Sequence, residues 1–378
     1  NNMDYPVKEI EQNIIELTKT WPDRFASVIK TAFGEGQSVP MIERYADSFS
    51  QSYMNEYLPS AALADLKNLE RLSNDNPLEM LFYRPQEESS TSQAVRLKLY
   101  HRHAPIHLSD VLPMLENFGL RVIDETPYKI ASSEGGCNWI MDFSMLHPSF
   151  PTENMSSSQA LFQEAFGLVW QNHLEDDAFN RLILSANITG RNVTILRAYA
   201  KYMRQIGLSF SIEYIANTMA EYPDISASLV ELFAYRFNPD HSFNQQEQDD
   251  LVTHITQSLD RVNNLDDDRI IRKYLDMIVA TVRTNFYQAK LNGEQKSYVS
   301  FKLLPDLIGD MPLPLPKFEI FVYSPKVEGV HLRGGKVARG GLRWSDRFED
   351  FRTEVLGLVK AQQVKNTVIV PVGAKGGF

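Results

Sequence analysis

Lys375, near the end of the chain, stands among glycines in the stretch 373–377, GAKGG. Glycines on both sides let backbone approach a ligand closely and leave the lysine uncovered. The apolar run 367–370, TVIV, predicts a strand that feeds this loop, and ligands gather at such strand ends. A lysine that loses water near other cations has a lowered pKa and can exchange protons near neutrality. The alternatives are an ordinary glycine-rich turn or a phosphate loop, but the pattern GxxxxGK followed by Ser or Thr does not occur.

Lys365 closes a helix that we predict from about Thr353 to Asn366. Leu358, Ala361 and Lys365 are spaced i, i+3, i+7 and share one face. The helix is apolar on most sides, as a buried helix would be, and a lysine ending a buried stripe must find an anion or lose its charge. The alternative, which spacing alone favours, is a last-turn lysine that the helix dipole stabilises and whose ammonium reaches solvent.

Two glycines flanked by arginines form the third element, Arg339, Gly340, Gly341, Leu342 and Arg343. Their backbone N–H groups and guanidinium forks could hold a carboxylate. The alternative is a β-turn with solvated arginines.

Charge is unevenly spread along the chain. The net charge is −10, yet residues 331–378 hold nine basic and four acidic residues, which leaves −15 for the rest. The acidic balance argues against general nucleic-acid binding, and the basic residues lack interleaved exposed aromatics apart from Trp344, which disfavours an RNA-binding tail. A local positive field suits a small anionic substrate, although a solvated basic face or an intersubunit patch fits equally well.

Composition excludes several classes of protein. No apolar run approaches the roughly 18–20 residues that span a bilayer, and no signal peptide is visible. Cys137 is the single cysteine, so no intrachain disulfide is possible and a cytoplasmic location is expected. His101 and His103 lie two apart on a predicted strand and share a face, but no Cys/His/Asp set completes a metal site, so no metal is expected.

Periodicity predicts three regions before the terminal block. Residues 6–75 read as helical, interrupted at Pro22, 34–36 and Pro40. Residues 78–146 predict strands at 78–83, 94–103, 121–130 and 138–147, with a helix after the first two that Ser109 or Asp110 caps and Gly119 ends. The strand 94–103 alternates apolar and polar residues, which predicts one buried face.

The order strand, helix, strand, strand is a large part of a ferredoxin-like unit, and LSDVLPMLENFGLRVIDE resembles ACT regulatory domains. Residues 157–290 are strongly helical, including the stretch IRKYLDMIVATVRTNFY at 271–287. From residue 297 the runs YVSFKLL, FEIFVYSP and GVHLRGG predict strands.

The terminal block GGLRWSDRFEDFRTEVLGLVKAQQVKNTVIVPVGAKGGF resembles the glutamate dehydrogenase family, and more closely its large-subunit NAD-dependent branch. The strong resemblance covers roughly residues 333–378. The ACT-like piece and the helical middle are similar, more loosely, to the long N-terminal extension of that branch.

The resemblance implies oxidative deamination of L-glutamate to 2-oxoglutarate and ammonium, with hydride passing to NAD. Lys375 corresponds to the catalytic lysine, and Lys365 to the lysine that contacts a substrate carboxylate. Gly340, Gly341 and Arg343 correspond to the family's glycine-pair element. Small-subunit enzymes have a lysine at the position of Arg339, and their glycine-rich loop contains one more glycine. Both differences affect residues that are expected to contact the substrate.

The expected fold is α+β and multidomain: a helical segment (1–76), an ACT-like unit (77–152), a helical domain (153–293) and the beginning of an α/β substrate-binding domain (294–378). No GxGxxG occurs, so NAD would bind a domain absent from this chain, and we expect the 378 residues alone to be inactive. The parent enzyme is expected to be a homo-oligomer. A second hypothesis is that residues 1–330 form an amino-acid-sensing module or an oligomerisation scaffold without chemistry of its own.

Overall fold

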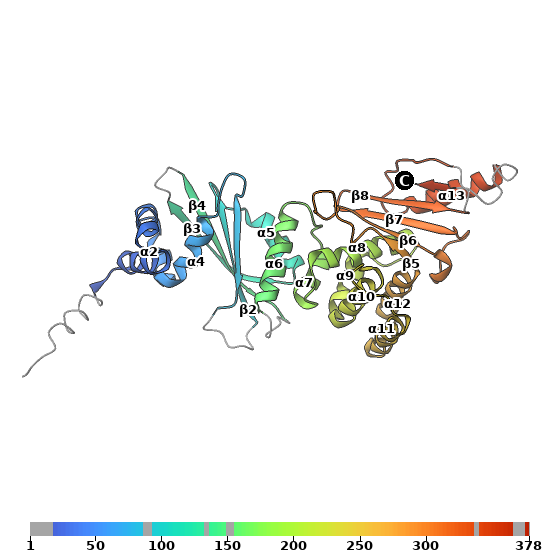
Figure 1. Ribbon diagram of the computed structural model, residues 1–378, viewed down its shortest axis with the longest axis horizontal. Coiled ribbons are helices and arrows are strands. Elements are labelled where there is room, and N and C mark those ends of the chain that lie inside the picture. Colours follow the sequence, from blue (N-terminus) through green and yellow to red (C-terminus); the bar gives the residue numbers. More distant parts are fainter. Residues whose placement is uncertain are drawn as a thin grey trace, which may run out of the picture. The chain divides into compact units, whose positions relative to one another are not determined.

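The computed structural model describes residues 18–85, 93–131, 136–148, 155–335, 340–365 and 375–377 (Figure 1). The chain divides into two compact units. Unit 1 takes residues 1–113 and 120–148, and unit 2 takes residues 114–119 and 149–378. The mixture of helices and antiparallel sheets confirms the predicted α+β class. No helix in the described part of the chain is both long and apolar enough to cross a membrane.

From residue 18 on, the described part of unit 1 starts with the helices α2 (Trp21–Tyr45), α3 (Gln51–Glu56) and α4 (Pro59–Leu69). Thr20 and Asp23 form a capping box at the start of α2, with Pro22 in its first turn. Gly34 has φ +75°, so α2 is two helical pieces joined at a kink. The predicted helical region and the break at 34–36 are therefore confirmed for the described residues.

The sheet of unit 1 has the order β1-β2-β4-β3 and is antiparallel throughout. Its strands are β1 (Leu78–Tyr83), β2 (Ala94–Arg102), β3 (Arg121–Ala131) and β4 (Cys137–Leu146). The helix α5 (Leu108–Asn117) joins β2 to β3, and Gly119, with φ +80°, follows its end. The predicted strand–helix–strand–strand order is confirmed, although the helix begins at Leu108, so Ser109 and Asp110 lie inside its first turn.

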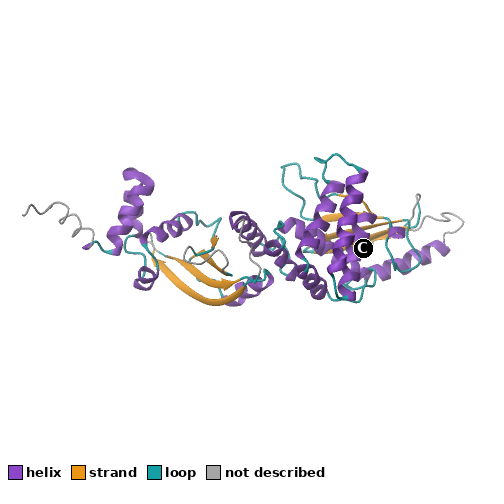
Figure 2. Cartoon of the chain, turned by 90° about the horizontal axis from the view of Figure 1, so that it is seen from below, coloured by secondary structure: helices purple, strands orange, loops and turns teal. Residues whose placement is uncertain are grey.

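The prediction of one buried face for β2 is wrong. Leu97 and Leu99 are buried on one face, but Lys98 and Tyr100 on the other are also buried, 2% and 0% exposed. Helices α2, α3 and α4 cover that second face (Figure 2). Tyr53 is among the aromatic residues of this core. Alternation identified a polar face, but a layer of helices covers it.

The two histidines do not share a strand face, which corrects a second prediction. β2 ends at Arg102, and His103 adopts φ +73° in the turn that follows. His101 bonds through Nδ1 to the Ala104 carbonyl oxygen at 2.7 Å. Across the described residues, no three His, Cys, Asp or Glu side chains gather as they would around a metal ion.

Helices make up the first part of unit 2. They are α6 (Met155–Trp170), η1 (Ala178–Asn180), α7 (Arg181–Ser185), α8 (Gly190–Gln205), α9 (Ile212–Glu221), α10 (Pro223–Phe237), α11 (Gln245–Ser258), η2 (Leu259–Arg261) and α12 (Leu265–Ala280). Thr189, Ser211 and Asn264 each accept a bond from a first-turn N–H and so fix where α8, α9 and α12 begin.

A sheet of order β5-β6-β7-β8-β9 completes unit 2. Its elements are β5 (Thr281–Thr284), β6 (Val299–Leu303), η3 (Pro305–Leu307), β7 (Phe318–Ser324), β8 (Val327–Arg333), α13 (Phe351–Lys365) and β9 (Lys375–Gly377). The predicted helix over 271–287 is wrong beyond Ala280, because Thr281, Arg283 and Thr284 pair with β6 as an edge strand, and this stretch is rich in β-branched residues. The predicted strand 367–370 lies outside the described residues.

Helix α8 supplies the core beneath this sheet. Tyr199 stacks on Phe301 of β6 with ring centroids 4.3 Å apart, and Tyr202 packs against Phe321 of β7 at 5.3 Å. The neighbouring strands therefore lie on a rigid aromatic layer, and the terminal segments of the chain are attached to it.

Candidate active site

Lys375 lies in a strand, not in the predicted loop. β9 pairs antiparallel with β8, so that Lys375 lies opposite Arg333 and Gly377 opposite His331. Residues 371–374 lie outside the described residues. The backbone of Lys375 and the last helical position of Lys365 are described, and their side chains are not.

The glycine pair runs beside this strand. The Gly377 N–H donates to the Gly341 carbonyl oxygen at 3.3 Å, and the Arg343 N–H donates to the Gly377 carbonyl oxygen at 2.9 Å. A Cβ at Gly377 would lie 3.1 Å from Leu342 Cδ2 and 3.3 Å from the Val330 carbonyl oxygen. A larger residue would have to displace the Leu342 and His331 side chains and the Val330 carbonyl, so glycine is the residue that fits here without displacement. The structure thus brings the Gly341–Arg343 stretch to within two residues of Lys375, although 31 positions or more separate them in sequence.

The segment that carries the glycine pair is open to solvent. Gly340, Gly341 and Arg343 are exposed. Leu342, Trp344 and Phe348 are 83%, 81% and 84% exposed. Large apolar side chains this exposed mark a surface for a ligand or for other protein. Arg339 lies outside the described residues.

A buried ion pair fixes α13 to the sheet. Arg352 donates through Nε to Glu319 Oε1 at 2.6 Å and through Nη2 to Oε2 at 2.8 Å. Both side chains are fully buried, and Glu319 lies on β7. Burial acts to lower the pKa of Arg352, but its hydrogen bonds to Glu319 and that carboxylate's charge outweigh burial and raise the pKa.

Gln205, the last residue of α8, holds the start of α13. Its Oε1 accepts from the Arg352 N–H at 3.1 Å, and its Nε2 donates to the Phe348 carbonyl oxygen at 2.8 Å. The amide therefore satisfies a first-turn N–H that the helix leaves free, and it also positions the chain just before the helix. The helix that ends at Lys365 is thus fixed at its first turn.

The stripe that we predicted to be buried on α13 is not the buried one. Ala361 is exposed and Val364 is 75% exposed, whereas Phe351, Val355 and Val359 are buried. The segment is a helix, as predicted, but a different face of it is buried, because Arg352 and Val355 point toward the sheet. The prediction of a helix buried on most sides is therefore wrong.

Sequence reasoning missed Glu319, Arg352 and Gln205. A signal for the first two exists. Glu319 shares the alternating phase of Phe321 and Tyr323 in β7, and Arg352 lies three residues before Val355. A charged residue in phase with buried apolar positions indicates a buried, paired charge.

Pairing reduces the positive field of residues 331–378. Arg352 is neutralised by Glu319, and Arg347 pairs with Asp350. Arg343 remains exposed beside the glycine pair. The field that a small anion would meet therefore comes from fewer of the nine basic residues than their number suggests.

Four protein-family models match the chain. "Bacterial NAD-glutamate dehydrogenase, catalytic domain" matches residues 254–378, and "Glutamate dehydrogenase, ACT3 domain" matches residues 77–158. Helical motif 3 of glutamate dehydrogenase matches residues 174–239, and helical motif 2 matches residues 28–72. The predicted ACT resemblance is confirmed.

Curated relatives match over nearly the whole chain. NAD-specific glutamate dehydrogenase of Halomonas elongata is 47% identical over 376 residues, 100% of this chain and 23% of that protein. The enzyme of the same name from Pseudomonas aeruginosa is 47% identical, over 100% of this chain and 24% of its own length. That of Mycobacterium tuberculosis is 40% identical, over 98% and 23%. The chain spans about a quarter of these relatives, and it belongs to the family of large bacterial NAD-specific glutamate dehydrogenases.

Proposed function

We propose that this chain forms part of an enzyme that converts L-glutamate, NAD and water into 2-oxoglutarate, ammonium and NADH. The observation that carries the proposal is the match of the whole chain to relatives named NAD-specific glutamate dehydrogenase. The backbone contact between Gly377 and the Gly341–Arg343 stretch supports it, because it joins the two glycine-rich elements that we expect around the substrate.

In this proposal Lys375 is the catalytic residue. Its amine takes a proton from the water that attacks the α-carbon, and it stabilises the charge that develops there. Backbone pairing places residue 375 on the strand whose Gly377 bonds to the glycine-pair segment, which supports a role for Lys375 beside that segment. Neighbouring cations favour its neutral form, which is the form that accepts a proton.

We assign the substrate's carboxylates to the other cations of the segment. Lys365 neutralises one carboxylate, which we take to be the α-carboxylate. Arg339 and the N–H groups of Gly340 and Gly341 face the other, and Arg343 adds a guanidinium at the same turn. The fixed first turn of α13 supports the placement of Lys365, since a helix anchored by Arg352 cannot slide along the sheet.

NAD supplies the hydride acceptor, and we propose that residues outside these 378 bind it. The chain has no GxGxxG turn between a strand and a helix, so these residues do not offer the usual dinucleotide cradle. We also propose the domain limits 1–76, 77–152, 153–293 and 294–378. An amino-acid effector and assembly of the whole enzyme as a homo-oligomer are further parts of the proposal.

The test is NADH formation by the full-length protein that contains these residues. With L-glutamate and NAD, we expect steady NADH production, and none with L-alanine or L-aspartate in place of glutamate. The reverse reaction, from 2-oxoglutarate, ammonium and NADH, must run in the same preparation. A pure, folded full-length protein that turns over neither direction would overturn the proposal.

A further inference from the structure

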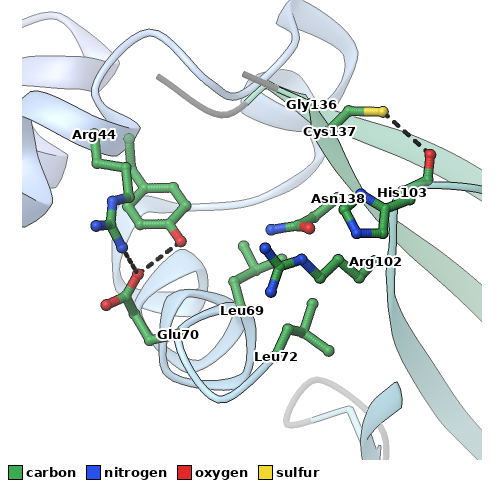
Figure 3. Close-up of a pocket in the computed structure, with 10 residues that line it drawn as sticks. Arg44, Leu69, Glu70, Leu72, Arg102, His103, Gly136, Cys137 and Asn138 are labelled. Atoms are coloured by element: carbon green, nitrogen blue, oxygen red, sulfur yellow. Dashed lines mark hydrogen bonds and ion pairs between the residues drawn. The ribbon is translucent and has the colours of Figure 1, made fainter. Parts of the chain in front are cut away.

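A small polar cavity lies in unit 1, away along the chain from every residue assigned to glutamate chemistry. It measures about 120 Å³ and opens between α2, the end of α4 and the adjoining ends of β2 and β4 (Figure 3). Sites for drug-sized ligands usually measure about 300–1,000 Å³. This cavity therefore suits only a small molecule or one chemical group of a larger one.

One wall of the cavity carries an acid whose charge is already balanced. Glu70 Oε1 accepts from Arg44 Nη1 at 3.0 Å and from the Tyr45 hydroxyl at 2.7 Å. The ion pair neutralises the carboxylate, and the phenol adds a second donor. Glu70 consequently presents little net negative charge to the cavity.

The opposite wall carries two groups with unused hydrogen-bonding capacity. Arg102 and Asn138 face each other across β2 and β4 in register. In Figure 3 both side chains point toward the wall that holds Glu70. Among the residues that the structure describes, neither side chain has a hydrogen-bond or ion-pair partner. A guanidinium and an amide aimed into the same small space form a donor pair that is complementary to an oxyanion.

The rim beside these residues is held in a fixed and unusual backbone shape. His103 has φ +73° and Gly136 has φ +106°. The His103 N–H donates to the Cys137 carbonyl oxygen at 2.9 Å, and Cys137 Sγ lies 3.5 Å from the His103 carbonyl oxygen. A left-handed histidine costs free energy, and such positions cluster at ligand sites.

The charges that line the cavity indicate what kind of ligand it binds. Arg44 and Arg102 line the cavity against one carboxylate, Glu70, so the site carries a net positive charge. We propose that this cavity binds one small oxyanion, a carboxylate or a phosphate, with Arg102 and Asn138 as its donors. Arg44 and Glu70 act as the neutral opposite wall. The site belongs to unit 1, and its existence does not depend on the proposed dehydrogenase chemistry.

Titration calorimetry on the 378-residue chain tests the proposal with four probes: acetate, succinate, L-alanine and inorganic phosphate. We expect at least one to bind with a dissociation constant in the millimolar range or tighter. The carboxylates and phosphate are separate arms, so the pattern shows which oxyanion the site takes. Arg102→Met should weaken that probe about tenfold or more, and Asn138→Leu about fivefold, because each removes a donor to a charged group.

Arg121→Met is the matched control, since Arg121 is exposed on β3 of the same unit and does not line the cavity. It should leave binding unchanged. Thermal unfolding of each variant reports folding; where Arg102→Met does not fold, Arg102→Lys keeps the charge, loses the fork and should still weaken binding. Absence of binding for all four probes, or affinity unchanged by substitution of Arg102, would overturn the proposal.

Discussion

Among the described residues, the buried ion pairs Arg352–Glu319 and Lys98–Asp65 each hold a helix against a sheet, and their surroundings differ. In unit 2, Arg352 and Glu319 are both fully buried and joined by two bonds. In unit 1, Lys98 and Asp65 are 3% and 1% exposed and joined by one bond of 2.7 Å. Asp65 also accepts hydrogen bonds from the hydroxyls of Tyr53 and Tyr100. The acid in unit 1 thus accepts from a lysine and two phenols, whereas Glu319 accepts both of its close hydrogen bonds from Arg352, with the buried Tyr202 hydroxyl beside the pair.

The difference shows how each region tolerates a change of charge. Burial lowers the pKa of Lys98, although the charge of Asp65 opposes that shift. Its ammonium also lies 3.5 Å from the centre of the Tyr57 ring. Arg352 stays charged at every pH at which the protein folds. The Arg352–Glu319 pair, which holds the proposed active-site helix, therefore stays charged. In unit 1, Asp65 has other hydrogen-bond donors besides Lys98.

The largest effect that we expect comes from removing the acid of the Arg352–Glu319 pair. Glu319→Ala leaves a buried, uncompensated guanidinium and should cost about 3–5 kcal/mol of unfolding free energy. Hydrogen exchange read by mass spectrometry in rising urea should show the loss in unit 2. Replacing both partners by methionine should recover much of it, because no buried charge then remains.

The exposed pair in the same segment is the control. Arg347 and Asp350 are 57% and 45% exposed, and Asp350→Ala should cost no more than about 1 kcal/mol. Equal costs for Glu319→Ala and Asp350→Ala would show that burial of the Arg352 pair contributes nothing.

Acid should destabilise unit 1 through His147, which is 3% exposed. Burial lowers the pKa of this imidazole from 6.5 to about 4. The folded state holds the neutral ring, so the stability that His147 contributes is complete above about pH 6.5 and is lost as the pH falls toward 4. The loss reaches at most about 3 kcal/mol.

Urea unfolding between pH 7 and 4 measures this dependence. His147→Gln, which cannot gain a proton, should flatten the curve for unit 1. The exposed His254→Gln in unit 2 should leave it unchanged. An unaltered slope in His147→Gln would contradict the assignment.

Removing Lys98 should cost less than removing Arg352, and this sharpens the comparison directly. Lys98→Met leaves Asp65 with two phenol donors, so we expect a loss of about 2 kcal/mol, the worth of one bond to a charged group. Arg352→Met leaves Glu319 without its fork and should cost more. Urea unfolding gives the free energy of unfolding of both variants under the same conditions. A larger loss for Lys98→Met than for Arg352→Met would contradict this expectation.

The smallest effect on stability should come from Arg343→Ala. The side chain is exposed beside the glycine pair, so the free energy of unfolding should change by less than about 0.5 kcal/mol. In the full-length enzyme we expect KM for glutamate to rise while the protein stays folded. Loss of stability with unchanged KM would place Arg343 in the fold and not in the site.

Much of the fold could be predicted from local pattern. The strand Leu78–Tyr83, the helix break at Gly34 and the strands after residue 297 follow from periodicity and from residues with special backbone preferences. The terminal block also predicted the family, which the relatives confirm.

The predictions that were wrong concern residues whose structure depends on contacts between distant parts of the chain. The alternating pattern predicts that Lys98 faces solvent, but α4 and the residue that ends α3 cover it through Asp65 and Tyr57. The sequence pattern predicts that Thr281–Thr284 continues α12, but these residues pair with β6 as a strand. The glycines around Lys375 predict a loop, but this residue pairs with β8 as part of a strand. The roles of Lys365, Lys375, Arg339 and the glycine pair remain predictions.

The most direct test of the account compares two lysines in the full-length enzyme, Lys375→Ala and Lys360→Ala. Lys360 is exposed on α13 and has no assigned role, so it is the matched control. We predict that Lys375→Ala lowers kcat for glutamate oxidation by about 10²–10⁴-fold, the usual worth of a positioned proton acceptor, while Lys360→Ala stays near the unaltered rate. A Lys375→Ala enzyme that keeps its kcat would contradict the central claim.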